Sequence, residues 1–163
     1  MSENKREEEQ VVVFHLRNQT YGIDIDSVLE IIRMESIIQV PGTPDFVEGI
    51  INLRGRIIPV MDLSKWFGLE TADITDSSRI IIVETSDITV GMIVDSVSEV
   101  LRFPLSCIEP PPPMVGAGNV EFIRGVALYD QRMFILLDLA RILVDDEKNV
   151  LSLMDTEAMK ILV

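Results

Sequence analysis

The chain has 163 residues, and its hydrophobic share of 47% is too large for a disordered chain. A formal net charge of −13 repels phosphate groups and argues against nucleic acid as a partner. The longest apolar runs fall well short of the roughly 20 residues of a membrane-spanning helix, so no direct membrane insertion is expected. Cys107 is the only cysteine, which excludes an internal disulfide and fits a reducing compartment.

The first ten residues are mostly charged, and we expect residues 1–10 to form a flexible arm. Residues 11–16 and 21–25 are β-branched and apolar runs separated by turn-forming residues, which predicts a hairpin. Asp26 then precedes Ser-Val and is expected to cap a short helical turn. A second hairpin is predicted over residues 49–61.

Asp62 is expected to cap a short helix that Gly68 ends. The same order of elements then returns, with runs at 80–83 and 90–94, a cap at Asp95, a hairpin over 125–137 and a cap at Asp138. Residues 144–163 carry apolar residues at helical spacing and predict a C-terminal helix.

The repeated order of elements reflects an internal duplication of the sequence. Residues 46–63 align without a gap with residues 122–139, at an offset of 76 (138 − 62), and residues 22–31 align with residues 91–100, at an offset of 69 (95 − 26). So long a period indicates one small unit built twice and packed against itself. Short strands joined by tight turns predict an all-β fold with minor helix, as two small β-barrels that share a core.

The sequence contains no Walker-type phosphate loop, no Gly-x-Ser-x-Gly elbow, no His-Glu-x-x-His and no Cys-x-x-Cys. His15 is the only histidine and lies in a strand pattern, where packing explains it better than general-base catalysis. Asp24, Asp26 and Glu30 are a candidate carboxylate cluster for acid–base chemistry or a cation, although capping and solvation explain them more simply. We therefore predict no enzyme, no cofactor and no metal site.

The two copies differ most at one hairpin tip, residues 52–56 against residues 128–132. Gly55 supplies a positive φ at the first tip and projects Arg54 outward. A fixed arginine suits an interface anchor because its planar guanidinium pairs bidentately with carboxylates. The alternative is a solvated turn arginine.

Four blocks strongly resemble the CheW family of chemotaxis coupling proteins: residues 21–25, 49–63, 90–97 and 132–138. The resemblance runs from about Val11 to Leu143. It implies two intertwined five-stranded SH3-like β-barrels, roughly residues 11–78 and 79–143, with strand exchange between them. It also implies a non-enzymatic adaptor that acts in the cytoplasm and at membrane-associated receptor arrays. Closed barrels hide their strand edges, which favours a monomer when the protein is alone. Its partners would be methyl-accepting chemoreceptors and the regulatory domain of the histidine kinase CheA.

The resemblance further implies a groove between the barrels that binds the helical hairpin tip of a chemoreceptor. Val28 and Val100 would form its apolar floor, and Glu30 and Arg54 would make polar contacts at its edge. The glycines would keep the backbone close, with a turn-forming role as the alternative. The implied receptor-binding residues are Val28, Glu30, Gly49, Arg54, Gly91, Val100 and Gly125.

A second, weaker contact with the kinase is implied at Glu109 and Met114, where the family carries an arginine and a phenylalanine. Met114 keeps the apolar bulk, but Glu109 reverses the charge. Either the partner kinase carries a compensating basic residue, or the rings of kinase and adaptor close more weakly.

Three relatives of the same fold remain as alternatives. They are an adaptor with an added receiver domain, a kinase regulatory domain, and a CheW-like adaptor in a non-flagellar chemosensory pathway. The residues after Leu143 are too few for a receiver domain, which needs on the order of 100 residues.

Overall fold

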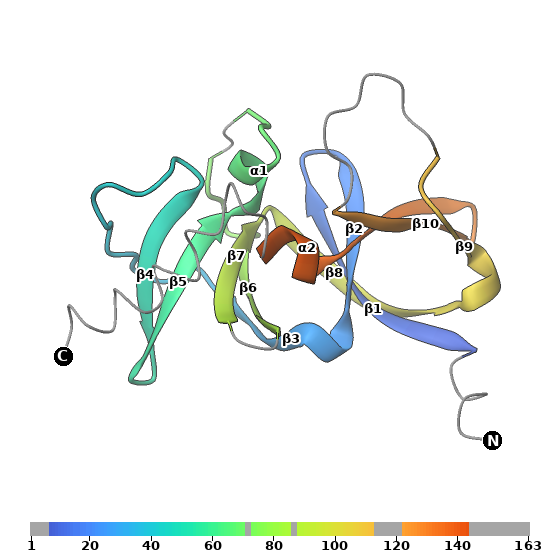
Figure 1. The fold of residues 1–163 in the computed structure, drawn as a ribbon, viewed down its shortest axis with the longest axis horizontal. Helices are drawn as coiled ribbons and strands as arrows, with labels where there is room; N and C mark the ends of the chain where they lie inside the picture. The colour runs from blue at the N-terminus through green and yellow to red at the C-terminus, as the bar shows by residue number, and fades with distance from the viewer. Residues whose placement is uncertain (1–6, 71–72, 86–87, 113–121, 144–163) are drawn as a thin grey trace.

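The computed structural model describes residues 7–70, 73–85, 88–112 and 122–143, in two lobes that lie side by side (Figure 1). Its strands form two sheets, and two short helices, α1 (Leu63–Trp66) and α2 (Leu139–Leu143), bury apolar side chains. The predicted all-β class with minor helix is confirmed. Most of the predicted N-terminal arm and the predicted helix over 144–163 lie outside the described residues.

Sheet A has the strand order β8 (Ser96–Pro104), β1 (Glu8–Leu16), β2 (Gln19–Asp24), β11 (Arg132–Leu137), β10 (Ile123–Tyr129) and β9 (Ile108–Glu109). Sheet B has the order β3 (Val28–Arg33), β6 (Arg79–Thr85), β7 (Ile88–Val94), β5 (Arg56–Asp62) and β4 (Val47–Leu53). Two 3₁₀ turns, η2 (Ile25–Ser27) and η3 (Leu105–Cys107), precede β3 and β9. The strand pairs β11–β2 and β5–β7 are parallel, and the remaining pairs are antiparallel.

The two sheets do not follow the two halves of the sequence. The β1–β2 hairpin of the first copy lies in sheet A beside the strands β8 to β11 of the second copy. The β6–β7 hairpin of the second copy lies in sheet B beside β3, β4 and β5 of the first copy. The copies have exchanged their first hairpins, and the two parallel pairs are the joints where they meet. The intertwined arrangement is therefore confirmed.

Each sheet curls around an apolar core of its own and packs its other face against the opposite sheet. We call the lobe of sheet A barrel A, with Phe103 and Phe134 in its interior, and the lobe of sheet B barrel B, with Ile80 and Ile82 in its interior. The third cluster, the shared core, comprises Val12, Phe14, Leu16, Tyr21, Ile23, Phe46, Val47, Ile50, Met61, Leu63, Trp66, Ile81, Val83, Ile88, Val90, Met92, Val94, Leu137, Leu139, Ile142 and Leu143.

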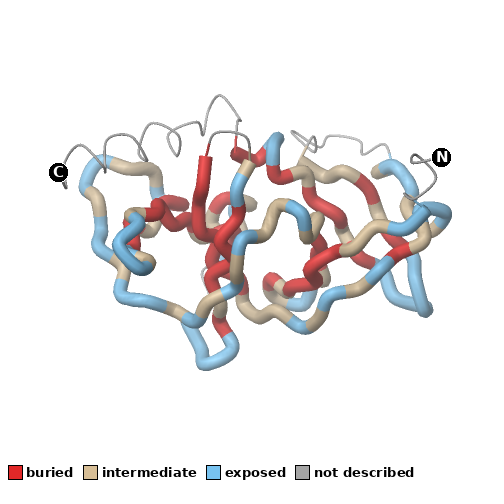
Figure 2. The backbone as a smooth tube through the Cα atoms, turned by 90° about the horizontal axis from the view of Figure 1, so that it is seen from below, coloured by how far each residue is buried: buried red, intermediate tan, exposed pale blue. Residues whose placement is uncertain are grey.

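Strands at the middle of the molecule are buried on both faces. In β1, Val11 and Val13 point into barrel A, whereas Val12 and Phe14 point into the shared core. Every residue of β7 is buried. This explains why these strands read as continuous apolar runs instead of alternating ones. Figure 2 shows the buried backbone concentrated at the centre and inside each lobe, with exposed residues at the outer loops and tips.

Several predicted caps are confirmed. The Asp62 carboxylate accepts the backbone N–H of Ser64 at 2.9 Å at the start of α1. Gly68 has a φ of 79° and follows the end of this helix. Its N–H donates to the Lys65 carbonyl and the Leu69 N–H donates to the Ser64 carbonyl, both at 2.9 Å, which is the Schellman arrangement. Asp138 accepts the N–H of Arg141 at 3.3 Å in α2.

Three local predictions are wrong. Asp24, not Asp26, caps η2, because its carboxylate accepts the Asp26 N–H at 2.9 Å. Asp95 caps no helix, since the chain continues from Asp95 directly into β8. Glu8, predicted to lie in the flexible arm, begins β1 and pairs with Pro104 of β8.

Asp95 binds the turn between β1 and β2. It accepts the backbone N–H of Arg17 at 2.6 Å and the Arg17 guanidinium at 3.2 Å. Arg17 has a φ of 58°, a left-handed conformation that costs a residue with a side chain on the order of 1–2 kcal/mol. Asp95 offsets this cost through its bonds to Arg17, and its own N–H donates to the His15 carbonyl at 3.0 Å.

Because both barrels bury the same central cluster, they should unfold together. We expect Ile81→Ala to lower the free energy of unfolding by about 2–5 kcal/mol, with urea transitions that still coincide when followed by Trp66 fluorescence and by far-UV circular dichroism. The exposed Leu105 of η3 provides the control, and Leu105→Ala should change stability by less than about 1 kcal/mol. Two separate transitions would contradict a core held in common.

Candidate functional site

The strands β3 and β8 occupy equivalent places in the duplication, and each forms one edge of its sheet beside the shared core. In β3, Val28 lies opposite Val83 and Ile31 lies opposite Ile81. Residues directly opposite in an antiparallel pair share a face of the sheet. Val83 and Ile81 belong to the shared core, so Val28 and Ile31 lie on the face that borders it.

The edge strand of barrel A repeats this arrangement. In β8, Val97 lies opposite Phe14 and Val100 lies opposite Val12, and both partners belong to the shared core. Each edge strand also changes register between its two apolar residues, at Leu29 in β3 and at Ser98 in β8. Such bulges bend a strand and re-aim its side chains, so both edges turn in the same way.

Burial divides these four residues into a floor and a rim. Val28 and Val97 are partly buried and pack against the shared core. Ile31 is 38% exposed and Val100 is 45% exposed. We call these residues the apolar strip. Exposed apolar groups that continue a buried cluster are typical of a docking surface.

The sequence had implicated Val28 and Val100 but missed Ile31 and Val97. The duplication contained the missing signal, because the offset of 69 residues relates Val28 to Val97 (97 − 28) and Ile31 to Val100 (100 − 31). Either half of the strip therefore predicts the other.

Arg54 reaches back from the tip of the β4–β5 hairpin to form an ion pair with Glu30 of β3. Arg54 and Gly55 both have a positive φ, 54° and 88°, as the two central residues of a type I′ turn require. Arg54 therefore shares the left-handed conformation that the sequence predicted only for Gly55. The Gly55 N–H donates to the Asn52 side-chain oxygen at 2.7 Å. The hydrogen bond to Glu30, aided by its charge, raises the pKa of Arg54.

An ion pair of the same kind is present in barrel A. Arg132 of β11 binds Glu99 of β8 at 2.9 Å, and its guanidinium lies over the Phe134 ring, 4.8 Å from the centroid. Glu30 and Glu99 correspond in the duplication, at the same offset of 69 (99 − 30). Each edge-strand glutamate is therefore bound by an arginine from the neighbouring hairpin.

The three glycines implied as site residues are buried within strands, so the alternative that they serve turns is wrong. A Cβ at Gly49 would lie 2.1 Å from the Ile38 carbonyl oxygen, and one at Gly125 would lie 2.8 Å from the Glu109 carbonyl oxygen. A Cβ at Gly91 would lie 2.8 Å from a methyl group of Ile80. These glycines permit close packing inside the barrels, and any effect on a partner passes through that packing.

Of the two residues implied in the second kinase contact, Glu109 is exposed on β9, an edge strand of sheet A. It pairs with Val126 of β10. Met114 lies outside the described residues.

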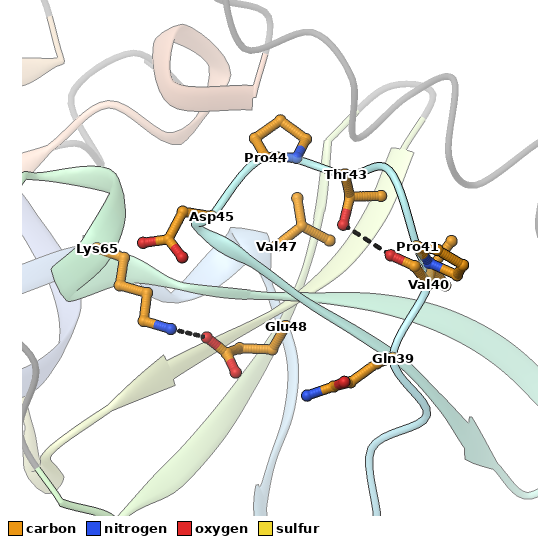
Figure 3. Close-up of a pocket in the computed structure, with 9 residues that line it drawn as sticks. All are labelled: Gln39, Val40, Pro41, Thr43, Pro44, Asp45, Val47, Glu48 and Lys65. Carbon is orange, nitrogen blue, oxygen red and sulfur yellow. Dashed lines mark hydrogen bonds and ion pairs between the residues drawn. The ribbon is translucent and has the colours of Figure 1, made fainter.

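Figure 3 shows a hollow of about 410 Å³ beside the loop before β4. Lys65 of α1 reaches into it and binds Glu48 at 2.8 Å, and Thr43 donates to the Val40 carbonyl at 3.0 Å. The bond to Glu48 raises the pKa of Lys65. Because the Lys65 ammonium is already bound to a carboxylate of the same chain, this ion pair stabilises the loop and does not form an anion-binding site. It is lined by Gln39, Val40, Pro41, Thr43, Pro44, Asp45, Val47, Glu48 and Lys65.

Within the described part of the chain, histidine, cysteine and carboxylate side chains nowhere gather in a group of three or more that would hold a metal ion. No helix among these same residues is long and apolar enough to cross a membrane.

Comparisons with known proteins agree with this geometry. Residues 10–147 match the family model of the CheW-like domain. The chain is 33% identical over 139 residues to the chemotaxis protein CheW of Klebsiella aerogenes, a match that covers 85% of this chain and 84% of that protein. It is 31% identical over 113 residues to Protein PilI of Pseudomonas aeruginosa, covering 69% and 64%. The crystal structure of the scaffolding protein TtCheW from Thermoanaerobacter tengcongensis superposes with a TM-score of 0.78 at 43% identity, covering 85% of this chain and 94% of that one.

The contact at Gly49 predicts a large cost for any side chain there. We expect Gly49→Ala to lower the free energy of unfolding by about 2–4 kcal/mol, because its Cβ meets backbone that cannot move aside and because φ is 146°. Gly55→Ala is the matched control, with φ at 88° but open space around the added carbon, and should cost about 1 kcal/mol. Urea denaturation measures both, and equal costs would contradict the packing role.

The ion pair in the hollow predicts a pH dependence. Because the pKa of Lys65 is raised in the folded protein, its contribution is complete below the ordinary value of 10.5 and is lost as pH rises through the folded pKa. We expect Lys65→Gln to destabilise by up to about 1 kcal/mol at pH 8, and the difference from wild type to shrink above pH 10.5. Urea denaturation of both proteins across this range measures it. A difference that does not change with pH would refute the assignment.

Proposed function

The chain belongs to the CheW family, and we infer from this that it is a scaffold protein of chemotaxis signalling. We propose that it couples transmembrane chemoreceptors to the histidine kinase CheA, in the cytoplasm and at receptor arrays, without catalysing a reaction itself. The extent of the match to the CheW-like domain supports this proposal, since the family model covers nearly all of the described residues. The TtCheW structure carries the description of a scaffolding protein.

The apolar strip is the observation that carries the receptor half of this proposal. A helical hairpin docks by placing apolar side chains in a groove. The strip offers a half-buried floor at Val28 and Val97, with exposed Ile31 and Val100 beside it. Glu30 lies on the same strand as Val28 but on its other face, opposite Ile82 of barrel B, so its ion pair with Arg54 offers polar groups to the side of the apolar strip.

Surface charge supports a kinase contact at Glu109. Most cations in the described residues are already bound to carboxylates of the same chain, namely Arg17, Arg54, Arg56, Lys65, Arg102, Arg124 and Arg132. With a net charge of −13, the surface that remains for partners is acidic. A kinase surface with a basic residue opposite Glu109 is therefore the complementary one.

A second candidate is the same adaptor role in a non-flagellar chemosensory pathway. The similarity to Protein PilI favours it, because this relative is not named as a chemotaxis protein. The two candidates share one mechanism and differ in the receptor and kinase that are bound.

Calorimetry against a CheA regulatory domain and a receptor cytoplasmic tip from the same cell tests the proposal. We expect wild type to bind both. Val28→Ala and Arg54→Ala should weaken receptor binding by about 1–3 kcal/mol because they remove a floor residue and a polar anchor, while kinase binding stays unchanged.

Ile74→Ala is the control, because Ile74 is exposed outside the apolar strip and should leave both affinities at the wild-type value. Binding to neither partner would sink the proposed function. Binding to both, with no loss in the Val28 and Arg54 variants, would move the receptor site away from the apolar strip.

A further inference from the structure

The first residues of β1 are attached to one end of barrel A. The Glu7 carbonyl accepts the N–H of Leu105 at 2.8 Å. Glu9 lies opposite Phe103, which belongs to the interior of barrel A, so Glu9 lies on the interior face of β1. We call residues 7–10 the N-terminal strap. Figure 1 shows the start of β1 at the same end of barrel A as η3 and β9.

Arg124 of β10 binds the N-terminal strap through a bidentate ion pair with Glu9. Its Nη1 donates to Glu9 Oε1 at 3.0 Å, and its Nη2 donates to Glu9 Oε2. The side chains of Glu9 and Arg124 are only 15% and 31% exposed, so salt screens this pair less than an ion pair on the open surface. Because β1 and β10 are not neighbours in sheet A, the bond spans the end of the barrel from one wall to another.

Arg124 occupies a β-bulge. The register of β10 against β11 shifts between Ile123 and Gly125, which leaves Arg124 as the extra residue with no residue opposite it in β11. A bulge bends its strand and re-aims the side chains beside it. Because the ladder does not hold Arg124, the shape of the bulge depends on the bond to Glu9.

The first copy of the repeat holds its bulge by a more local bond. Glu48 is the extra residue of β4 and the equivalent of Arg124 (124 − 76), and it binds Lys65, which lies 17 residues away. The equivalent of Lys65 is Arg141 (65 + 76). Both positions are cationic in the second copy, so like charges cannot repeat that bond. The second copy takes its carboxylate from the start of the chain instead, 115 residues away.

The bulge sets the position of the edge strand β9. Gly125 follows Arg124 directly, and a Cβ there would lie 2.8 Å from the Glu109 carbonyl oxygen, so the two backbones are in contact. β9 has two residues, and among the described strands it pairs only with β10, at Val126 and Ala127. The position of Glu109 therefore depends on that of the bulge.

We propose that Glu9 and Arg124 are positioning residues for the kinase contact at Glu109. The N-terminal strap holds the bulge of β10, and the bulge holds the exposed carboxylate of Glu109 where a basic residue of the kinase can pair with it. This inference rests on the proposed function, because it concerns the same contact. The competing explanation is that the ion pair only stabilises the end of barrel A.

Paired variants separate the two roles. Glu9→Gln and Arg124→Met each break the ion pair and leave one charge without its partner. The neutral double variant, with both changes, removes that unpaired charge. The swapped double variant, Glu9→Arg with Arg124→Glu, rebuilds the bond in the opposite sense. Arg102→Met is the matched control, because Arg102 lies 3.9 Å from Glu8 of the same strap but is 68% exposed.

Two readouts report on Glu109, and two report on the rest of the molecule. Amide hydrogen exchange of β9, followed by NMR, measures how firmly the edge strand is held. Sedimentation velocity of a mixture with the CheA regulatory domain measures the fraction in complexes larger than one-to-one, because Glu109 belongs to the second contact with the kinase. The one-to-one affinity for that domain and the thermal midpoint serve as controls.

We expect Glu9→Gln and Arg124→Met each to speed amide exchange in β9 about 10-fold or more. Each should lower the fraction of larger complexes about 3-fold, with an unchanged one-to-one affinity. The neutral double variant should regain the wild-type thermal midpoint but not the assembly, and the swapped variant should recover both. Arg102→Met should match wild type in every readout.

A second cycle tests whether Arg124 acts through Glu109. Glu109→Lys should lower the fraction of larger complexes while amide exchange in β9 stays at the wild-type rate. Adding Arg124→Met to Glu109→Lys should cause no further loss of assembly, because the positioned carboxylate is already gone. Losses that multiply in the double variant would show that Arg124 acts on the kinase by another route and would contradict the proposal.

Wild-type exchange and assembly in Arg124→Met, alongside a loss in Glu109→Lys, would overturn the positioning role and leave the proposed function standing. Assembly that returns together with stability in the neutral double variant would also refute it, because a purely structural role predicts that result. If wild type forms no complex beyond one-to-one, the contact at Glu109 falls and the inference falls with it. Failure of wild type to bind the CheA regulatory domain at all would instead remove the proposed function itself.

Discussion

Burial of the central strands on both faces is the constraint on which this structure depends. The β1–β2 and β6–β7 hairpins carry apolar side chains on each face, one set for a barrel interior and one for the shared core. Neither copy of the repeat can bury both sets alone, since a single barrel covers only one face of each hairpin. Two barrels packed back to back cover both, so the fold requires a second copy of the repeat.

The candidate site lies where the burial of the central strands ends, at the edge strands of the two sheets. β3 and β8 are each one of the two edge strands of their sheet, and the shared core emerges there as half-buried valines with exposed neighbours. Close packing elsewhere keeps these edges in place. Gly49 and Gly125 let the Ile38 and Glu109 backbones pass within contact of β4 and β10. The site therefore needs no added domain or loop, because it is the rim of the core itself.

Local features were predictable because their causes lie close together in the sequence. The hairpins, the caps at Asp62 and Asp138 and the Schellman glycine at Gly68 depend on neighbours within a few residues. The binding of Asp95 to Arg17 was not predictable, because 78 residues separate the partners and the left-handed Arg17 has no sequence signal. The ion pairs of the edge strands were missed for the same reason.

Hairpin exchange also carries information about origin. Each barrel takes one hairpin from the other copy, and the parallel pairs β11–β2 and β5–β7 join strands of different copies. Two separate single-repeat chains that traded hairpins would form a domain-swapped homodimer of the same topology. The present chain has the form of such a dimer joined head to tail, and in a single chain each half can change without its twin, as the unlike hairpin tips show.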